Sequence, residues 1–340
     1  MVEERTIYLD VVRVVACIMV ILMHAPISGV GTEEHGSFLV LDSYLTTPCV
    51  PLFFMVSGAL LLPCKEGTSA ILYLRRRLGK IIGPTVCFSL FYLANSSSSV
   101  DWMISLFSLP FSVQGHGVLW FMYTLAGLYL LVPILSSWVR EGSKRELEFY
   151  LLLWLVTLLY PYISLFLGVN TSETGVLYYF TGYVGYFLLG YYLNTVVIRN
   201  SWWVCFLGMA MFPLPLLNKI LGWDLDFYKV FWYLSAPVAI MTASWFIGIK
   251  CLFAQKRLSR VVISVLEQTN NLSFGIYLIH IFVMRTLLWN WSMVQAIGNY
   301  YLQTLIVAVL TFVGSYAVCY LIAYLPFSQY IIGYSIRKNK

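Results

Sequence analysis

The chain has 340 residues, of which 60% are hydrophobic and 11% charged, and its formal net charge is +6. Soluble globular proteins carry about 25% charged residues, so less than half of the usual charge is present. This composition excludes a soluble enzyme, a disordered chain and a protein with a single membrane anchor. One helical crossing takes about 20 residues, which leaves room for about ten crossings and for no sizeable domain outside the membrane.

Apolar segments of membrane-spanning length follow one another along the whole chain. We predict spans at roughly 7–27, 44–62, 80–95, 118–139, 148–168, 177–198, 201–217, 230–249, 271–289 and 303–325. The predicted fold class is therefore all-α: a polytopic membrane helix bundle of about ten transmembrane helices, with residues 1–340 forming one transmembrane domain.

Lysine and arginine predict the orientation of these spans, because cytoplasmic loops retain them. With a cytoplasmic N-terminus, 17 of the 21 basic residues fall in inner segments and only Lys219 and Lys229 in outer loops. The inner residues are Arg5, Lys65, Arg75, Arg76, Arg77, Lys80, Arg140, Lys144, Arg145, Arg199, Lys250, Lys256, Arg257, Arg260, Arg337, Lys338 and Lys340. Both termini are therefore predicted to be cytoplasmic.

Several other function classes lack support in the sequence. The positive charge reflects the membrane topology. The sequence has no basic stripe interleaved with exposed aromatic residues, so a nucleic-acid partner is not predicted. The seven cysteines are odd in number and include no CxxC motif, so neither a disulfide framework nor a metal site is expected. The sequence contains no Walker motif, so ATP-driven transport is not expected.

The first predicted span contains three ionisable residues, Asp10, Arg13 and His24. Each such residue costs roughly 2.5–3.5 kcal/mol inside a bilayer and suggests a functional site. At about 100° per residue, Arg13 and His24 differ by only ~20° around a helix, and Asp10 lies within ~60° of Arg13. The three side chains therefore share one face. The alternative is a self-neutralising Asp10–Arg13 pair with a histidine bonded to a neighbouring helix.

Four further segments are candidates, each with an alternative structural explanation. His280, followed by Arg285, lies in the ninth predicted span, where it is either catalytic or bonded to a neighbouring helix. The basic run either holds its loop on the cytoplasmic side of the membrane or binds a phosphate-bearing ligand. It consists of Arg75, Arg76, Arg77 and Lys80. The aromatic segment 119–123 forms either a membrane belt or a sugar-stacking surface. Residues 50–58 combine Pro51, Ser57 and Gly58, which permit a kink and close helix approach.

Together these motifs resemble the acyltransferase-3 family of integral membrane acyltransferases, in the family's order. They are Arg13 and His24 after Tyr8-Leu9-Asp10, residues 51–58, the basic run 75–80 before Pro84, residues 119–123, 127–135 and 182–192, and Ser273 to His280. One position departs from the pattern. The family often has histidine directly before Leu-Trp-Phe, whereas Val118 stands here and His116 lies two residues earlier.

The resemblance implies transfer of an acyl group, usually acetyl, from cytoplasmic acyl-CoA (acetyl-CoA) to a hydroxyl of a surface polysaccharide or its lipid-linked precursor. The expected partners are this donor, a glycan acceptor and the lipids of the cytoplasmic (inner) membrane. Since the chain runs to Lys340, soon after the tenth span, complete transfer is expected within the membrane domain.

The residues and the resemblance together predict three groups of site residues. They are His24, Arg13 and Asp10 for catalysis; Arg75, Arg76, Arg77 and Lys80 for binding acyl-CoA; and Ser57, Trp120, Tyr123, Tyr277 and His280 for lining the substrate site. His24 is either a general base or an acyl carrier. The competing hypotheses are a transporter or flippase without acyl transfer, and a sensor or exporter that keeps the scaffold alone.

Overall fold

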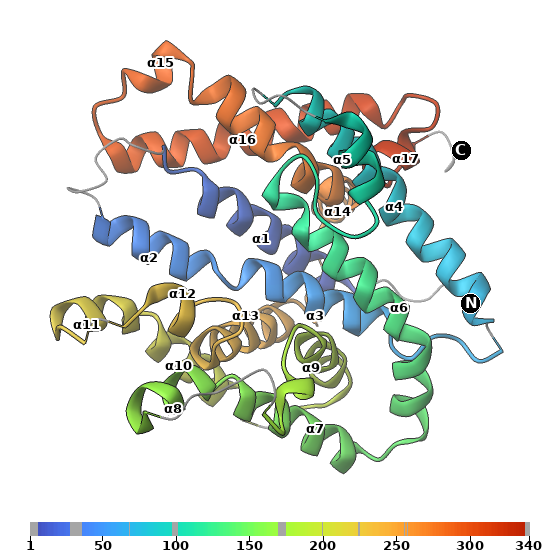
Figure 1. The fold of residues 1–340 in the computed structure, drawn as a ribbon, viewed down its shortest axis with the longest axis vertical. Helices are drawn as coiled ribbons and strands as arrows, with labels where there is room; N and C mark the ends of the chain where they lie inside the picture. The colour runs from blue at the N-terminus through green and yellow to red at the C-terminus, as the bar shows by residue number, and fades with distance from the viewer. Residues whose placement is uncertain are drawn as a thin grey trace. The chain divides into compact units, whose positions relative to one another are not determined.

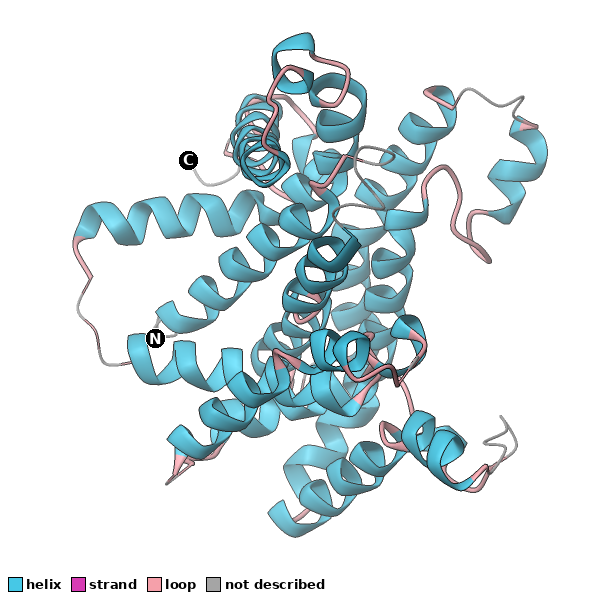
Figure 2. Cartoon of the chain, turned by 90° about the vertical axis from the view of Figure 1, so that its left-hand side faces the viewer, coloured by secondary structure: helices cyan, strands magenta, loops and turns pink. Residues whose placement is uncertain are grey.

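The regular structure of the described residues is entirely helical, as Figure 2 shows. The computed structural model describes residues 6–27, 36–67, 69–96, 101–168, 175–198, 200–223, 225–254, 256 and 258–336. The predicted all-α class is confirmed. Six of the basic residues that predict the orientation lie outside the described residues: Arg5, Arg199, Arg257, Arg337, Lys338 and Lys340.

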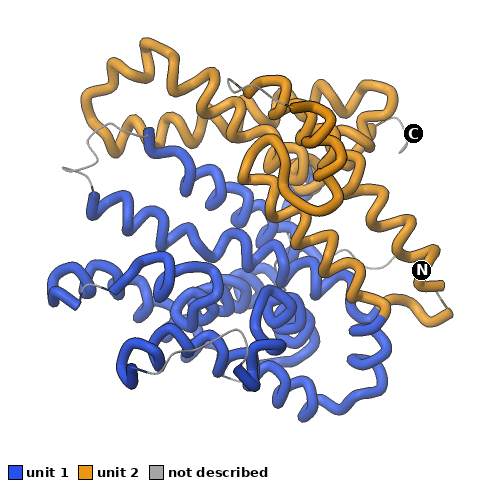
Figure 3. Tube along the Cα trace, viewed as in Figure 1, with its two compact units in different colours: residues 1–63, 134–266 blue, residues 64–133, 267–340 orange. Residues whose placement is uncertain are grey.

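The chain divides into two compact units, coloured separately in Figure 3. Unit 1 comprises Met1–Pro63 and Ile134–Leu266, and unit 2 comprises Cys64–Pro133 and Glu267–Lys340. Two of the boundaries fall inside long helices, α6 (Trp120–Glu141) and α14 (Arg260–Ile281). Each of these helices therefore contributes one end to each unit.

The other helices belong to one unit each, and Figure 1 labels the α-helices among them. Unit 1 contains α1 (Ile7–His24), α2 (Gly36–Thr46), α3 (Cys49–Leu61), α7 (Lys144–Thr157), α8 (Tyr160–Leu167), η2 (Tyr178–Phe180), α9 (Val184–Thr195), α10 (Ser201–Met211), α11 (Leu214–Ile220), α12 (Phe227–Val230) and α13 (Ala236–Phe253). Unit 2 contains α4 (Ala70–Ala94), α5 (Trp102–Ser108), η1 (Gly117–Leu119), the π-helical turn η3 (Phe282–Leu288), α15 (Ser292–Gln295), α16 (Tyr300–Ile322) and α17 (Ser328–Ile332).

Seven helical segments of the described chain are long and apolar enough to cross a membrane, or eight if the bent pair α7 and α8 forms one span. Of the ten predicted spans, 80–95 and 177–198 have no counterpart among them. The first lies in α4, which begins with a strongly basic stretch. The second corresponds to α9, whose 12 residues extend only ~18 Å, against a hydrocarbon core of ~30 Å. A count of ten spans therefore stays a prediction.

Helices α3 and α9 lie side by side in unit 1, and two glycines let their backbones touch (Figure 1). A Cβ atom added at Gly58 would lie 1.8 Å from the carbonyl oxygen of Phe187, and one at Gly190 would lie 2.0 Å from that of Met55. Both distances are far below a van der Waals contact. Two segments that look separate in the sequence, 51–58 and 182–192, are therefore the two sides of one helix crossing.

The C-terminal end of α9 is capped by a lysine from another helix. The ammonium group of Lys250, on α13, donates to the carbonyl oxygens of Leu193 at 2.6 Å and Asn194 at 3.0 Å. These carbonyls belong to the last turn, where a helix has no internal donors left and carries partial negative charge. The Asn194 side chain in turn accepts from the hydroxyl of Tyr8 and donates to the carbonyl of Ala59. Helix α1 is thereby joined to α9 by a side-chain hydrogen bond.

In unit 2, the short helix α17 packs against α4 (Figure 1). Gly83 of α4 permits the approach, because a Cβ atom there would lie 3.1 Å from the carbonyl oxygen of Tyr330. Helix α17 then ends at Gly333, whose φ of +75° lies in the left-handed region that favours glycine. The chain consequently turns back beside the basic end of α4.

Candidate active site

Helix α1 carries Asp10, Arg13 and His24, the residues predicted for catalysis. All three are half-buried, and His24 is the last residue of the helix, two positions before Pro26. With a rise of 1.5 Å per residue, an unbroken α1 separates Arg13 from His24 by ~16 Å along the axis. The helix packs against α2, α3 and α13 of unit 1. The predicted single helix through the three residues is confirmed.

Ser57 lies on α3, directly before the glycine that touches α9. Its neighbours Val56 and Gly58 are buried, whereas Ser57 is half-buried. Since α3 also packs against α1, Ser57 belongs to the same unit as His24.

A pocket of about 600 Å³ lies beside the basic end of α4 in unit 2. Its lining includes Arg75, Arg76 and Lys80, three of the four residues predicted to bind a phosphate-bearing donor. We call it the basic pocket. Its complete lining is Arg75, Arg76, Gly79, Lys80, Gln329, Tyr330, Gly333, Tyr334 and Ser335. The volume falls in the range of about 300–1,000 Å³ that small-molecule sites occupy.

Arg77 has a different environment from its neighbours. Its guanidinium lies over the ring of Tyr73, one turn earlier on α4, with 6.0 Å between the central carbon and the ring centroid. This is a cation–π contact. Arg77 is not among the residues that line the basic pocket. The structure therefore separates Arg77 from the other three basic residues of the run.

The wall of the basic pocket opposite α4 comes from residues 329–335, which the sequence analysis did not single out. These residues follow the last predicted span by only a few positions, and their spacing from the Arg75–Lys80 run gives no sign of proximity. The available signal is two tyrosines, Tyr330 and Tyr334, around Gly333, directly after an apolar span.

Trp120, Tyr123, Tyr277 and His280 lie in unit 2, where α6 begins and α14 ends. The hydroxyl of Tyr277 donates to the carbonyl of Val118 at 2.7 Å, and that of Tyr123 donates to Leu109 at 2.9 Å. His280 is fully buried, and its Nδ1 lies 2.5 Å from the carbonyl oxygen of Tyr277. These contacts join Tyr277 to η1, Tyr123 to the residue that follows α5, and His280 to its own helix.

His116, to which the sequence assigns no role, precedes η1. Its Nδ1 accepts a hydrogen bond from the backbone N–H of Val118 at 3.2 Å, and its ring lies 5.2 Å from that of Tyr92. Burial, together with the charge of Arg285, lowers the pKa of His116. The imidazole is therefore held in its neutral form, as a helix cap.

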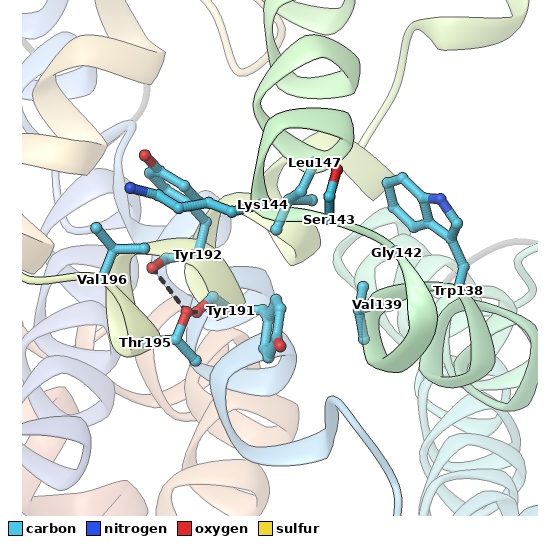
Figure 4. A pocket seen from close by; sticks show the side chains of 10 residues that line it. All are labelled: Trp138, Val139, Gly142, Ser143, Lys144, Leu147, Tyr191, Tyr192, Thr195 and Val196. Atoms are coloured by element: carbon cyan, nitrogen blue, oxygen red, sulfur yellow. Dashed lines mark hydrogen bonds between the residues drawn. The ribbon is translucent and has the colours of Figure 1, made fainter.

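A second, smaller pocket in unit 1 is shown in Figure 4 and has a volume of about 140 Å³. It lies between the α6–α7 turn and the end of α9. Its one lysine, Lys144, pairs with Glu148 at 3.3 Å, and Glu148 also accepts a hydrogen bond from Tyr192 at 2.7 Å. Its volume is below that of typical ligand sites. The basic pocket is the better candidate for a large anionic ligand.

The predicted site residues divide between the two units. Asp10, Arg13, His24 and Ser57 belong to unit 1, and all the others belong to unit 2. Among the described residues, no group of three or more His, Cys, Asp or Glu side chains is arranged to hold a metal ion.

The fold and the sequence define the class of protein as a helical, multi-pass membrane protein. It has ionisable residues along the apolar helix α1 and a basic pocket beside α4. A family model described as an acyltransferase domain matches residues 6–324, so the chain belongs to the acyltransferase-3 family of membrane acyltransferases. The resemblance seen in the sequence is thereby confirmed. No curated protein and no solved structure matches the chain.

Proposed function

We propose that this protein transfers an acyl group, preferentially acetyl, from cytoplasmic acyl-CoA to a hydroxyl of a surface polysaccharide or its lipid-linked precursor. It acts in the cytoplasmic membrane, as a bundle of ten spans with both termini inside. The observation that carries the proposal is the basic pocket, found in a chain of an acyltransferase family. Family membership favours this enzyme over a transporter or flippase.

The donor is acyl-CoA because its phosphates match the basic pocket. Coenzyme A carries a diphosphate and a 3′-phosphate, and arginine binds such groups through paired, charge-assisted hydrogen bonds. Arg75, Arg76 and Lys80 line the pocket and are exposed, so their charged groups are accessible to a ligand. We assign the phosphate contacts to these three residues. Arg77 is left out because its guanidinium lies over Tyr73.

His24 handles the proton of the acceptor in this proposal. As a general base it removes the proton of the sugar hydroxyl while the oxygen attacks the thioester carbonyl. The new C–O ester bond forms, the C–S bond breaks, and the proton passes from the imidazole to the CoA thiolate. In the second route, the imidazole nitrogen attacks the thioester carbonyl, the C–S bond breaks, and the imidazole N–H proton passes to the CoA thiolate. The sugar oxygen then attacks the acyl-imidazole, the C–N bond breaks, and the hydroxyl proton returns to the imidazole. Both routes require a neutral imidazole at the start.

The remaining predicted residues have supporting roles. Arg13 and Asp10 lie on the His24 helix, where Asp10 would keep the Arg13 side chain in place near the inner end. Ser57 of α3 would line the acceptor path beside α1. The four residues at the α6 and α14 ends of unit 2 would also line the substrate site: Trp120, Tyr123, Tyr277 and His280.

The proposal is tested by measuring both products of the reaction. Purified protein in lipid nanodiscs is given acetyl-CoA and a glycan extract, and free CoA thiol is measured while mass spectrometry follows the glycan. One acetyl mass added per thiol released is the expected result. A protein that moves the glycan from one side of the membrane to the other without releasing thiol would be a flippase, because a flippase consumes no thioester. That outcome would overturn the proposal.

A further inference from the structure

The two walls of the basic pocket differ in chemistry. The α4 wall contributes two arginines and a lysine, whereas the opposite wall contributes Tyr330 and Tyr334 and no charged side chain. None of the nine lining residues is acidic. A pocket with cations on one side and aromatic rings on the other fits a ligand that has phosphates at one end and a flat, uncharged ring system at the other.

The aromatic wall is a packed part of unit 2. Ile332 is fully buried against Gly275 of α14, where a Cβ atom would lie 2.9 Å from that of Ile332. The backbone N–H of Ile336 donates to the carbonyl oxygen of Ala323 at 3.1 Å, which ties the end of the segment back to the end of α16. These contacts hold the segment in place on either side of Tyr334.

Gly83 and Gly333 set the separation of the two walls. At Gly83 the backbone of α4 meets that of Tyr330, and at Gly333 a Cβ atom would lie 3.7 Å from the carbonyl oxygen of Lys80. The tyrosines are therefore carried directly beside the basic turn. Tyr330 remains 51% exposed and lines the pocket, so it is accessible to a ligand there.

We infer that residues 329–335 form the base-binding wall of the donor site, where Tyr330 and Tyr334 stack on the adenine of acyl-CoA while the α4 cations hold its phosphates. The inference rests on the proposed function and names residues beyond 324, where the family match ends. Stacking on an aromatic side chain is a general way to hold a base. An anionic lipid headgroup would use the cations but would give the tyrosines no planar partner.

The test measures binding to the full-length protein in phosphatidylcholine nanodiscs. Two donors are compared: acetyl-CoA, and acetyl-phosphopantetheine, which lacks the adenosine and two of the three phosphates. We expect the double variant Tyr330→Ala, Tyr334→Ala to bind acetyl-CoA roughly tenfold more weakly and acetyl-phosphopantetheine unchanged. The matched pair Tyr330→Phe, Tyr334→Phe keeps both rings and should keep the affinity. The single variant Tyr330→Ala alters only a half-exposed ring and should show part of the loss.

Tyr324→Ala is the control outside the pocket. This exposed tyrosine lies two residues after the end of α16, its hydroxyl bonds to that of Tyr320 at 2.8 Å, and it does not line the basic pocket. It should leave both affinities unchanged. Adenosine 3′,5′-bisphosphate should displace acetyl-CoA, whereas phosphatidylglycerol added to the nanodiscs should not.

Two outcomes separate this inference from the proposed function. If the unaltered protein binds acetyl-CoA and the alanine pair binds it equally well, the inference is overturned and the donor proposal stands. If the unaltered protein does not bind acetyl-CoA, both fall. Displacement of acetyl-CoA by phosphatidylglycerol but not by adenosine 3′,5′-bisphosphate would identify a lipid site and would also overturn the inference.

Discussion

The guanidinium of Arg77 lies 6.0 Å from the ring centroid of Tyr73, while Arg75 and Arg76, its neighbours in sequence, line a pocket. On a helix, adjacent residues point about 100° apart, so a run of three arginines cannot serve one ligand equally. The contact with Tyr73 therefore provides a control within the same run, with the same charge.

The first prediction uses this difference. The double variant Arg75→Ala, Arg76→Ala should weaken acetyl-CoA binding by tenfold or more, because each guanidinium can form a charge-assisted pair with phosphate. The salt dependence of binding should fall as well, since fewer ionic contacts remain to be screened. Arg77→Ala removes one charge from the same helix and should leave the affinity within about twofold. If titration showed that Arg77→Ala, which removes one charge, lost half of the binding free energy that the double variant loses with its two charges, only the summed charge would matter and the prediction would be wrong.

The second prediction concerns the volume of the basic pocket. Gly79 lines it, and a Cβ atom added there meets no other atom within 4 Å. Gly79→Trp should therefore place a large ring in the pocket and block acetyl-CoA without changing any charge. Gly79→Ala adds one methyl group and a better helix former, so it should fold at least as well and bind with little loss. Unchanged binding by Gly79→Trp would mean that the donor lies elsewhere.

The third prediction separates chemistry from donor binding. His24→Ala should lower the rate of glycan acylation by roughly 10²–10⁴-fold, the usual contribution of a general acid–base group. Acetyl-CoA affinity should remain, because Arg75, Arg76 and Lys80 are unaltered. Rapid quenching with acetyl-CoA but no acceptor distinguishes the two routes: a labelled acyl-protein that is absent in His24→Ala supports the acyl carrier. Near-normal acylation in the variant would remove His24 from the reaction.

The fourth prediction concerns the crossing of α3 and α9. Gly58→Ala would place a methyl carbon 1.8 Å from the carbonyl oxygen of Phe187, so the two backbones must separate. We expect a loss of about 3 kcal/mol or more, above the usual cost of overpacking because a backbone atom blocks the way. Thermal unfolding in detergent should show this loss. Gly127→Ala, on α6, meets no atom within 4 Å and is the control that should be at least as stable as the unaltered protein.

The fifth prediction is a pH dependence centred on His116. Its folded-state pKa is lowered, so the folded protein binds fewer protons than the unfolded chain as the pH falls through the unfolded value of about 6.5. Stability should therefore be complete above that value and decrease on acidification. Protonation also removes the Nδ1 lone pair that caps Val118. His116→Asn keeps a side-chain acceptor for Val118 but removes the titrating group, so it should flatten the decrease in stability between about pH 7 and 5. An unchanged slope would contradict the prediction.

The sequence predicted the helical class, the long spans and the helix that carries Asp10, Arg13 and His24, because these depend on local hydrophobicity and on a fixed rise and rotation per residue. The predicted span 177–198 contains α9, whose regular helix has only 12 residues, and its crossing of the membrane stays a prediction. Gly58 could be recognised from the sequence as permitting a close helix approach, but α9 could not be identified as the neighbouring helix, because that contact depends on tertiary packing.

Part of the site could not be predicted for a similar reason. The Arg75–Lys80 run is visible in the sequence, but its helical phase alone does not identify Tyr73 as the partner of Arg77. Tyr330 and Tyr334 come beside this run only through the left-handed turn at Gly333 and the close approach at Gly83. Long-range proximity of this kind depends on tertiary packing, which no spacing along the chain records.

The two walls of the basic pocket are synthesised at different times. A chain is made from its N-terminus, so α4 is synthesised long before Gln329 to Ser335 leave the ribosome. Until then the arginines of α4 have no aromatic wall beside them. If the pocket binds acyl-CoA as proposed, donor binding would begin only after residues 329–335 have been made and packed against α4.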